Sequence, residues 1–252
     1  METLLGQCQW PSLPPKFDQA LREAVQFILS RFKPVGIIVA GTIVRGNPAP
    51  SSDLDIYVIH LEPFRQRVQK FFNGVPAEIF VNPPTAVKRY FVEEHAALRP
   101  ITAHMLATGF VILNLDPIIS DLRQQAVGWL AKSPEETSES LTLARYMAAT
   151  MYEDALDVAE HDPATAQMLL SRAMVDMLHF CFRKAGQFYP RSKALLAMLN
   201  EIDLETAQLA CQFFEQSDLT ARLRLAEQIA ERTIGVRGFF EWESIPDKVE
   251  VK

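Results

Sequence analysis

Two aspartates one residue apart, Asp53 and Asp55, are the residues of this sequence best suited to chemistry. They open an apolar run, Ile56–Ile59, which predicts a buried β-strand. Because alternate residues of a strand share a face, both carboxylates point the same way and repel each other. A cation between them relieves this repulsion. Mg²⁺ suits such a pair, because it prefers oxygen ligands and usually also takes substrate phosphate oxygens.

The residues that precede the aspartates supply groups that bind phosphate. A predicted strand, Val35–Ala40, ends in Gly41-Thr42, and the polar loop after it carries Arg45 and Ser52. The turn offers backbone N–H groups and a hydroxyl, while the guanidinium of Arg45 offers a fork of hydrogen-bond donors. Together with the aspartates, this stretch indicates a site for a metal ion and a polyphosphate.

The order and spacing of these residues resemble the signature of the polymerase-β-like nucleotidyltransferase superfamily. That signature has a Gly-Ser turn after a strand, an Arg three residues past the Ser, and Ser-Asp-x-Asp on the next strand. This chain reads Gly41-Thr42-x-x-Arg45 and Ser52-Asp53-Leu54-Asp55, with Thr42 in place of the usual serine. Threonine keeps the hydroxyl. The alternative, an aspartate-rich surface turn before a strand, requires the flanking strands and Arg45 to be coincidental.

The resemblance implies a role for each of these residues. Asp53 and Asp55 would hold two Mg²⁺ ions, which bridge the phosphates of ATP or of another nucleoside triphosphate. The β- and γ-phosphates would lie against four residues: Gly41, Thr42, Arg45 and Ser52.

A third acid of the superfamily comes from the next core strand, predicted here over Val75–Val81. In this chain that acid is Glu78, which lies between Ala77 and Ile79. By the same resemblance, Glu78 completes the metal shell or acts as general base on the acceptor hydroxyl. A glutamate that faces water from an edge strand is the alternative, although a carboxylate in an apolar strand is costly without a partner.

The rest of the chain predicts an α/β domain followed by an all-α domain. Apolar residues at helical spacing predict a helix over Glu62–Phe72, with Asn73-Gly74 as its C-terminal cap. Further helices are expected over Phe17–Phe32, Thr85–Leu98 and Ile101–Ala107, and a strand over Phe110–Leu115. Strand signals stop after Ile118, and helix starts follow at Ser133-Pro134 and Asp162-Pro163. We therefore expect a mixed-sheet nucleotidyltransferase domain over residues 1–118 and a C-terminal helical bundle over residues 119–252.

This layout resembles antibiotic nucleotidyltransferases and related toxin–antitoxin proteins, whose helical domain lines the acceptor side of a cleft. Pro190-Arg191-Ser192-Lys193 is similar to a segment of aminoglycoside adenylyltransferases whose lysine reaches the triphosphate. The resemblance implies that role for Lys193, and an ordinary lysine at a helix start is the alternative. Glu153 or Asp154 could hold a cationic acceptor if either faces the cleft, although a solvated helix face is the default.

Composition narrows the class of partner. The net charge of −6 disfavours nucleic acid and favours a cationic partner. Three cysteines without metal-site spacing, and the absence of a signal peptide or of an apolar run long enough to span a membrane, indicate a cytoplasmic protein. The tail, with Phe239, Phe240 and Trp242, either folds back on the bundle or packs on a second subunit of a homodimer.

The resemblance implies transfer of a nucleoside monophosphate, most simply AMP from ATP, to a hydroxyl of a small molecule. Three alternatives stay open: transfer of AMP to a protein, as antitoxin-type members do, a non-catalytic nucleotide sensor, and an RNA acceptor, which the acidic charge disfavours. A protein acceptor would become labelled by radioactive ATP, and a sensor would bind ATP without releasing pyrophosphate.

Overall fold

The computed structural model describes residues 2–49 and 51–246. It divides into two compact units that meet between Lys132 and Ser133. The helix Ile118–Leu130 (α5) belongs to the N-terminal unit, because it packs on the two helices before it, Pro84–Ala96 (α3) and Ile101–Thr108 (α4). The sequence placed the domain boundary at residue 118, before α5. In the structure the two units divide after α5, between Lys132 and Ser133.

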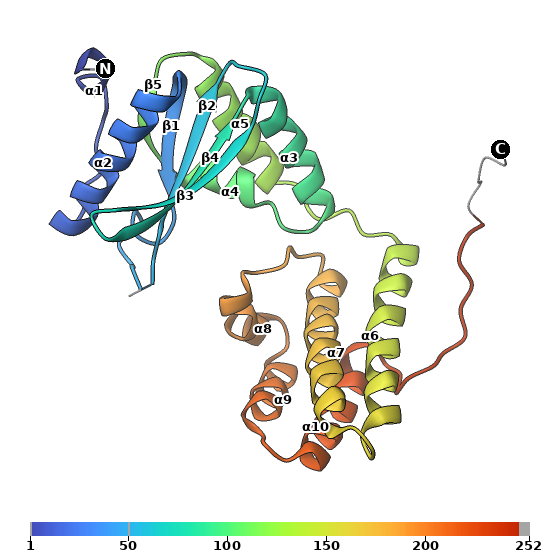
Figure 1. The fold of residues 1–252 in the computed structure, drawn as a ribbon. Coiled ribbons are helices and arrows are strands. Elements are labelled where there is room, and N and C mark those ends of the chain that lie inside the picture. The colour runs from blue at the N-terminus through green and yellow to red at the C-terminus, as the bar shows by residue number, and fades with distance from the viewer. Residues whose placement is uncertain (1, 50, 247–252) are drawn as a thin grey trace. The chain divides into compact units, whose positions relative to one another are not determined.

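A five-stranded mixed sheet forms the centre of the N-terminal unit (Figure 1). Its strands lie in the order β3 (Gln66–Phe72), β4 (Val75–Asn82), β2 (Leu54–His60), β1 (Pro34–Ala40) and β5 (Phe110–Asn114). The pair β2–β4 is parallel, and the other neighbouring pairs are antiparallel. The central strands β1, β2 and β4 are apolar runs because helices cover the sheet on both faces.

Strand alternation divides the apolar residues between two cores. Leu54, Ile56 and Val58 of β2 pack on the face covered by α2 (Pro15–Arg31). Tyr57 and Ile59 pack on the opposite face, under α3, α4 and α5. The register of β2 thus places Asp55 on the same face as Tyr57. The N-terminal segment before α2 contains one short helix, α1 (Glu2–Leu5).

The segment Glu62–Phe72, predicted as a helix, contains the edge strand β3, so that prediction was wrong. Phe72 pairs with Val75, and the two residues between them, Asn73 and Gly74, have φ of 45° and 71°. Positive φ at both central residues is the geometry of a two-residue hairpin turn, which Asn-Gly favours. The side chain of Phe71 is 72% exposed, so the apolar residues at helical spacing do not share a buried face.

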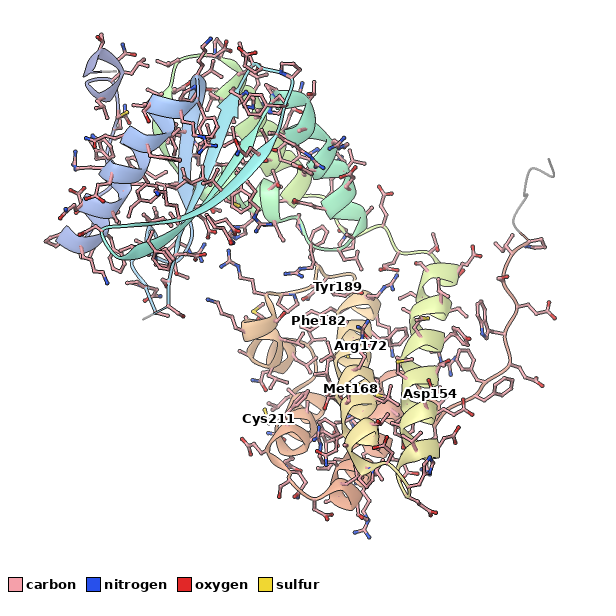
Figure 2. The ribbon with its side chains drawn as sticks, in the orientation of Figure 1. Asp154, Met168, Arg172, Phe182, Tyr189 and Cys211 are labelled. Atoms are coloured by element: carbon pink, nitrogen blue, oxygen red, sulfur yellow. The ribbon has the colours of Figure 1, made fainter. Side chains whose placement is uncertain are left out.

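The C-terminal unit is helical, as predicted. Its elements are α6 (Ser138–Val158), α7 (Pro163–Lys184), the 3₁₀ turn η1 (Ser192–Ala194), α8 (Leu195–Ile202), α9 (Leu204–Glu215) and α10 (Leu219–Thr233). Side chains such as Phe182 of α7 fill one apolar core between them (Figure 2). Asp162 caps α7 as expected. Ser133 does not cap α6, because Thr137 and Ser140 form a reciprocal capping box at its start.

The described part of the C-terminal tail folds back on α6. Phe240 packs against the helical core, and the guanidinium of Arg145 lies 4.4 Å from the centroid of its ring. The rings of Tyr146 and Trp242 lie 5.3 Å apart, centroid to centroid. Of the two expectations for the tail, packing on the bundle is confirmed at Val236, Phe240 and Trp242, packing on a second subunit stays a prediction, and residues 247–252 lie outside the described part. Among the described helices, none is both long and apolar enough to cross a membrane.

Candidate active site

Three carboxylates meet at one end of the sheet. The register places Asp55 of β2 opposite Ala40 of β1 and opposite Glu78 of β4. One oxygen from each of Asp53, Asp55 and Glu78 lies within 4.8 Å of the others, and all three residues are half-buried. The structure therefore brings together the three acids singled out in the sequence, on the face of the sheet that carries α3, α4 and α5.

Gly41 brings the backbone close to this cluster. It follows β1 directly and has φ of +94°, a region that side chains disfavour. A Cβ built on Gly41 would lie 2.7 Å from Oδ2 of Asp55, closer than real contacts allow. Glycine is thus required here both by its backbone conformation and by the nearby carboxylate.

The loop between β1 and β2 is closed by its own hydrogen bonds. The hydroxyl oxygens of Thr42 and Ser52 lie 2.8 Å apart, and the Ala49 N–H donates to Ser52 Oγ over 2.8 Å. The Asn47 N–H donates to the Thr42 carbonyl over 3.0 Å. Both hydroxyls are thereby held beside the start of β2, while Arg45 is exposed on the loop.

Glu78 is held by two side chains of the neighbouring strand β3. Arg67 donates to Oε1 of Glu78 from Nε over 2.6 Å, and its Nη2 lies 2.5 Å from the same oxygen. Gln69, which pairs directly with Glu78 across the strands, donates from Nε2 to that oxygen over 2.7 Å. Neither residue was predicted as part of the site, because the sequence pattern predicted a helix over Glu62–Phe72. The Asn73-Gly74 hairpin signal could have placed them on a strand beside Glu78.

The chemistry of the carboxylate trio fits a divalent cation. Three carboxylates at this separation repel one another unless positive charge lies among them. They supply only hard oxygen ligands, which suit Mg²⁺ or Mn²⁺ and leave coordination positions for phosphate or water. Asp53, Asp55 and Glu78 are therefore the residues able to hold metal at this end of the sheet.

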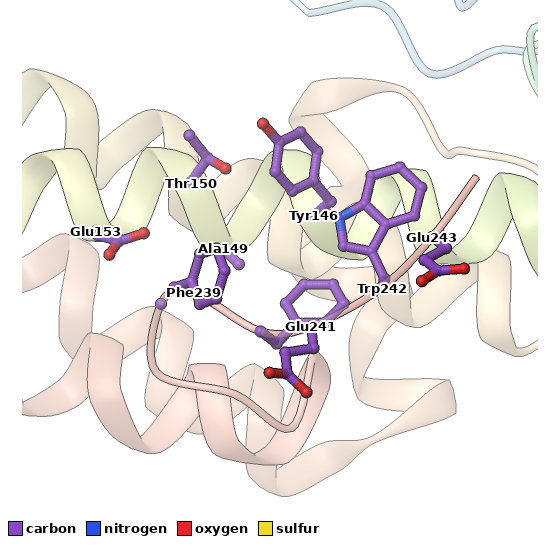
Figure 3. A pocket seen from close by; sticks show the side chains of 10 residues that line it. Tyr146, Ala149, Thr150, Glu153, Phe239, Glu241, Trp242 and Glu243 are labelled. Atoms are coloured by element: carbon purple, nitrogen blue, oxygen red, sulfur yellow. The ribbon is translucent and has the colours of Figure 1, made fainter.

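The other three sequence candidates lie in the helical unit. Lys193 is exposed in the 3₁₀ turn η1, and its contact with a triphosphate stays a prediction. Asp154 is exposed on α6 (Figure 2). Glu153 of the same helix is half-buried and lines a hollow of about 580 Å³ under the C-terminal tail (Figure 3).

That hollow is acidic and aromatic. Among its lining residues are three carboxylates and four aromatic rings: Glu153, Glu241 and Glu243, with Tyr146, Phe239, Phe240 and Trp242. In Figure 3 the rings of Tyr146 and Trp242 lie next to each other, with the carboxylates of Glu153 and Glu243 on opposite sides of them. Aromatic faces and carboxylates are both complementary to an organic cation.

Comparisons with known proteins support the fold. Neither any protein-family model nor any curated protein sequence matches this chain. Among solved structures, the chain is similar to a nucleotidyltransferase-like protein from Exiguobacterium sibiricum 255-15, with a TM-score of 0.52 and 15% sequence identity. The match covers 86% of this chain and 73% of that one. At this identity the likeness is one of fold, and the chain has a nucleotidyltransferase-like fold.

Proposed function

We propose that this protein is a metal-dependent nucleotidyltransferase that moves AMP from ATP to a hydroxyl of a small molecule. The observation that carries the proposal is the trio of Asp53, Asp55 and Glu78 beside the Gly41-Thr42 turn. In a nucleotidyltransferase-like fold, this combines a metal-binding set of oxygens with a phosphate-binding turn.

Asp53 and Asp55 would hold two Mg²⁺ ions. When bound, such ions neutralise the phosphates and stabilise the attacking and leaving oxygens. The backbone of Gly41, the hydroxyls of Thr42 and Ser52 and the guanidinium of Arg45 would hold the β- and γ-phosphates. These groups come from one loop, so they can fix the direction in which the leaving pyrophosphate points.

Glu78 would receive the proton of the acceptor hydroxyl or complete the metal shell. In the transfer, a bond forms between the acceptor oxygen and the α-phosphorus. The bond from that phosphorus to the bridging oxygen of pyrophosphate breaks in line, and pyrophosphate leaves with the electron pair. If Glu78 is the base, the acceptor proton ends on its carboxylate.

A cationic acceptor fits the charge of the protein. The net charge of −6 attracts cations over the surface as a whole. Within the helical unit by itself, the hollow under the tail combines three carboxylates, Glu153 among them, with aromatic rings and so suits an organic cation. We therefore propose hydroxylated amines as the first acceptors to test.

The test is pyrophosphate release from ATP labelled at the α-phosphate, in Mg²⁺, with a panel of hydroxylated amines. We expect release that requires both Mg²⁺ and an acceptor, with the label on the small molecule. Label on a protein or on RNA would mean that the acceptor is a protein or RNA instead of a small molecule. ATP binding without pyrophosphate release would indicate a sensor. Release that is equal in wild type and in the Asp53→Asn, Asp55→Asn double variant would overturn the proposed site.

A further inference from the structure

Two residues of the edge strand β3, Arg67 and Gln69, carry an inference that rests on the proposed function and extends it. They are two apart on the strand and so share its face with Glu78, their cross-strand neighbour. Register places Asp55, Glu78 and Gln69 side by side on the adjacent strands β2, β4 and β3. The metal-binding trio is thus continued, on the same face of the sheet, by two side chains that donate hydrogen bonds.

The donors on Glu78 found in the described part of the chain converge on a single oxygen. Nε and Nη2 of Arg67 and Nε2 of Gln69 lie 2.5–2.7 Å from Oε1. A carboxylate oxygen has two lone pairs, so the hydrogen bonds from Arg67 Nε and Gln69 Nε2 use its capacity to accept, and Arg67 Nη2 adds a close ion-pair contact. Ligation or proton transfer at Glu78 then falls to Oε2.

Arg67 and Gln69 are themselves fixed in place. The guanidinium carbon of Arg67 lies 4.8 Å from the centroid of the Phe80 ring, and Phe80 stacks on Tyr57 at 5.9 Å. Arg67 is 63% exposed but Glu78 only 15%, so the arginine reaches in from the sheet edge to a largely covered carboxylate. Gln69 is held opposite Glu78 by the β3–β4 ladder.

We propose that Arg67 and Gln69 are positioning residues that hold Glu78 by Oε1 and thereby present Oε2 to the metal and the acceptor. This assigns a function to β3, the strand that the sequence did not predict. Groups that orient a metal ligand in this way typically change metal affinity or activity about 10–100-fold when they are removed.

The strand offers matched controls for a test of this proposal. Gln66 is the same residue type on the same strand, but it lies on the opposite face, with Val68 and Lys70. Gln69→Ala and Gln66→Ala therefore remove equal side chains without changing charge. Arg67→Lys keeps the positive charge and removes the fork that reaches Oε1 from two nitrogens.

The experiment measures Mn²⁺ binding by calorimetry in the presence of a non-hydrolysable ATP analogue, with a thermal melt of each variant. We expect Gln69→Ala and Arg67→Lys to weaken Mn²⁺ binding about 10-fold, the lower end for an orienting group. Gln66→Ala should bind as wild type does. A structural role alone would lower the melting temperature without changing Mn²⁺ affinity.

The outcomes separate this inference from the function on which it rests. Mn²⁺ binding by wild type that Asp53→Asn abolishes, together with unchanged binding by Gln69→Ala and Arg67→Lys, would overturn the positioning role alone. Wild type that binds no Mn²⁺ would overturn both the metal site and the positioning role. If Gln69→Ala does not fold, Arg67→Lys decides, because it retains charge and a long side chain at an exposed position.

Discussion

Two glutamate–arginine pairs, one in each unit, differ in how the carboxylate is used. In the helical unit, Arg183 donates from Nε to Oε1 of Glu136 over 2.7 Å and from Nη2 to Oε2 over 2.9 Å. Ser140 also donates to Oε2, over 2.6 Å. Both oxygens are therefore occupied, and the Glu136 side chain is 9% exposed.

Glu78 is paired differently, because the donors of Arg67 and Gln69 converge on Oε1 and two more carboxylates lie nearby. A pair that uses both oxygens can stabilise the fold but has little capacity left for a ligand. A carboxylate that is held by one oxygen keeps the other available for a metal ion or a proton, but the repulsion by neighbouring carboxylates lowers the stability of the fold. The comparison predicts that Glu136 determines stability and that Glu78 determines activity.

The largest expected effect is on turnover. Glu78→Gln should lower pyrophosphate release about 10²–10⁴-fold if Glu78 is the base, because the amide cannot take the acceptor proton. The melting temperature should change little, because the variant loses the ion pair with the exposed Arg67 but also the repulsion with Asp53 and Asp55. Steady-state kinetics and calorimetry with ATP check both roles: retained ATP affinity supports a base, and lost affinity supports a metal ligand. Wild-type turnover in this variant would remove Glu78 from the reaction.

Glu136→Gln should affect stability instead. Loss of one partner leaves the Arg183 guanidinium, 18% exposed, without its full counter-charge. We expect the free energy of unfolding to fall by about 2 kcal/mol, as for the loss of hydrogen bonds to a charged group, because both partners are half-buried. Urea denaturation measures this, with the exposed neighbour Glu135→Gln as control. Equal values for the two variants would mean that the pair contributes no stability.

The same pair gives stability a dependence on pH. Burial alone raises the pKa of Glu136, but the hydrogen bonds from Arg183 and Ser140 and the arginine charge outweigh it, so the pKa is lowered. Because the folded pKa lies below the unfolded one, the contribution is complete above the ordinary glutamate pKa. It is lost as pH falls through the folded pKa. Denaturation midpoints of wild type and Glu136→Gln should therefore converge at acid pH, and a constant difference would contradict this.

A smaller effect is expected at Arg45, in the loop of the N-terminal unit. Arg45→Ala should weaken ATP binding about 10-fold, as the loss of a charge-assisted hydrogen bond does, and leave the fold intact because Arg45 is exposed. AMP binding should change less, since AMP lacks the β- and γ-phosphates. Calorimetry with both nucleotides checks this. Lysine should rescue poorly because it lacks the planar fork. An equal loss for ATP and AMP would place Arg45 away from those phosphates.

Local patterns predicted much of the fold and the centre of the site. Asp53 and Asp55 could be placed on one face because strand alternation is strict, and Glu78 lies in the next apolar strand along the chain. The hairpin of β3 and β4 was missed because exposed phenylalanines mimic a helical stripe, and edge strands need little apolar alternation. Arg67 and Gln69 lie on β3, so their contact with Glu78 was not predicted either.

Long-range pairing limited the rest. Glu136 and Arg183 lie far apart in the sequence and meet only because α7 packs on α6. The start of α6 was misplaced because Ser133-Pro134 resembles a cap, whereas Thr137 and Ser140 form the capping box. A local signal can indicate a helix start, but several such signals close together compete, and packing of the helix decides among them.

The most direct test of the central claim is the thermal shift produced by ATP with Mg²⁺. A ligand that binds the folded protein raises its melting temperature, so wild type should melt at a higher temperature with both present than with ATP alone. In the Asp53→Asn, Asp55→Asn double variant, the Mg²⁺-dependent part of the shift should vanish. A full Mg²⁺-dependent shift in the double variant would place the metal elsewhere and contradict the account.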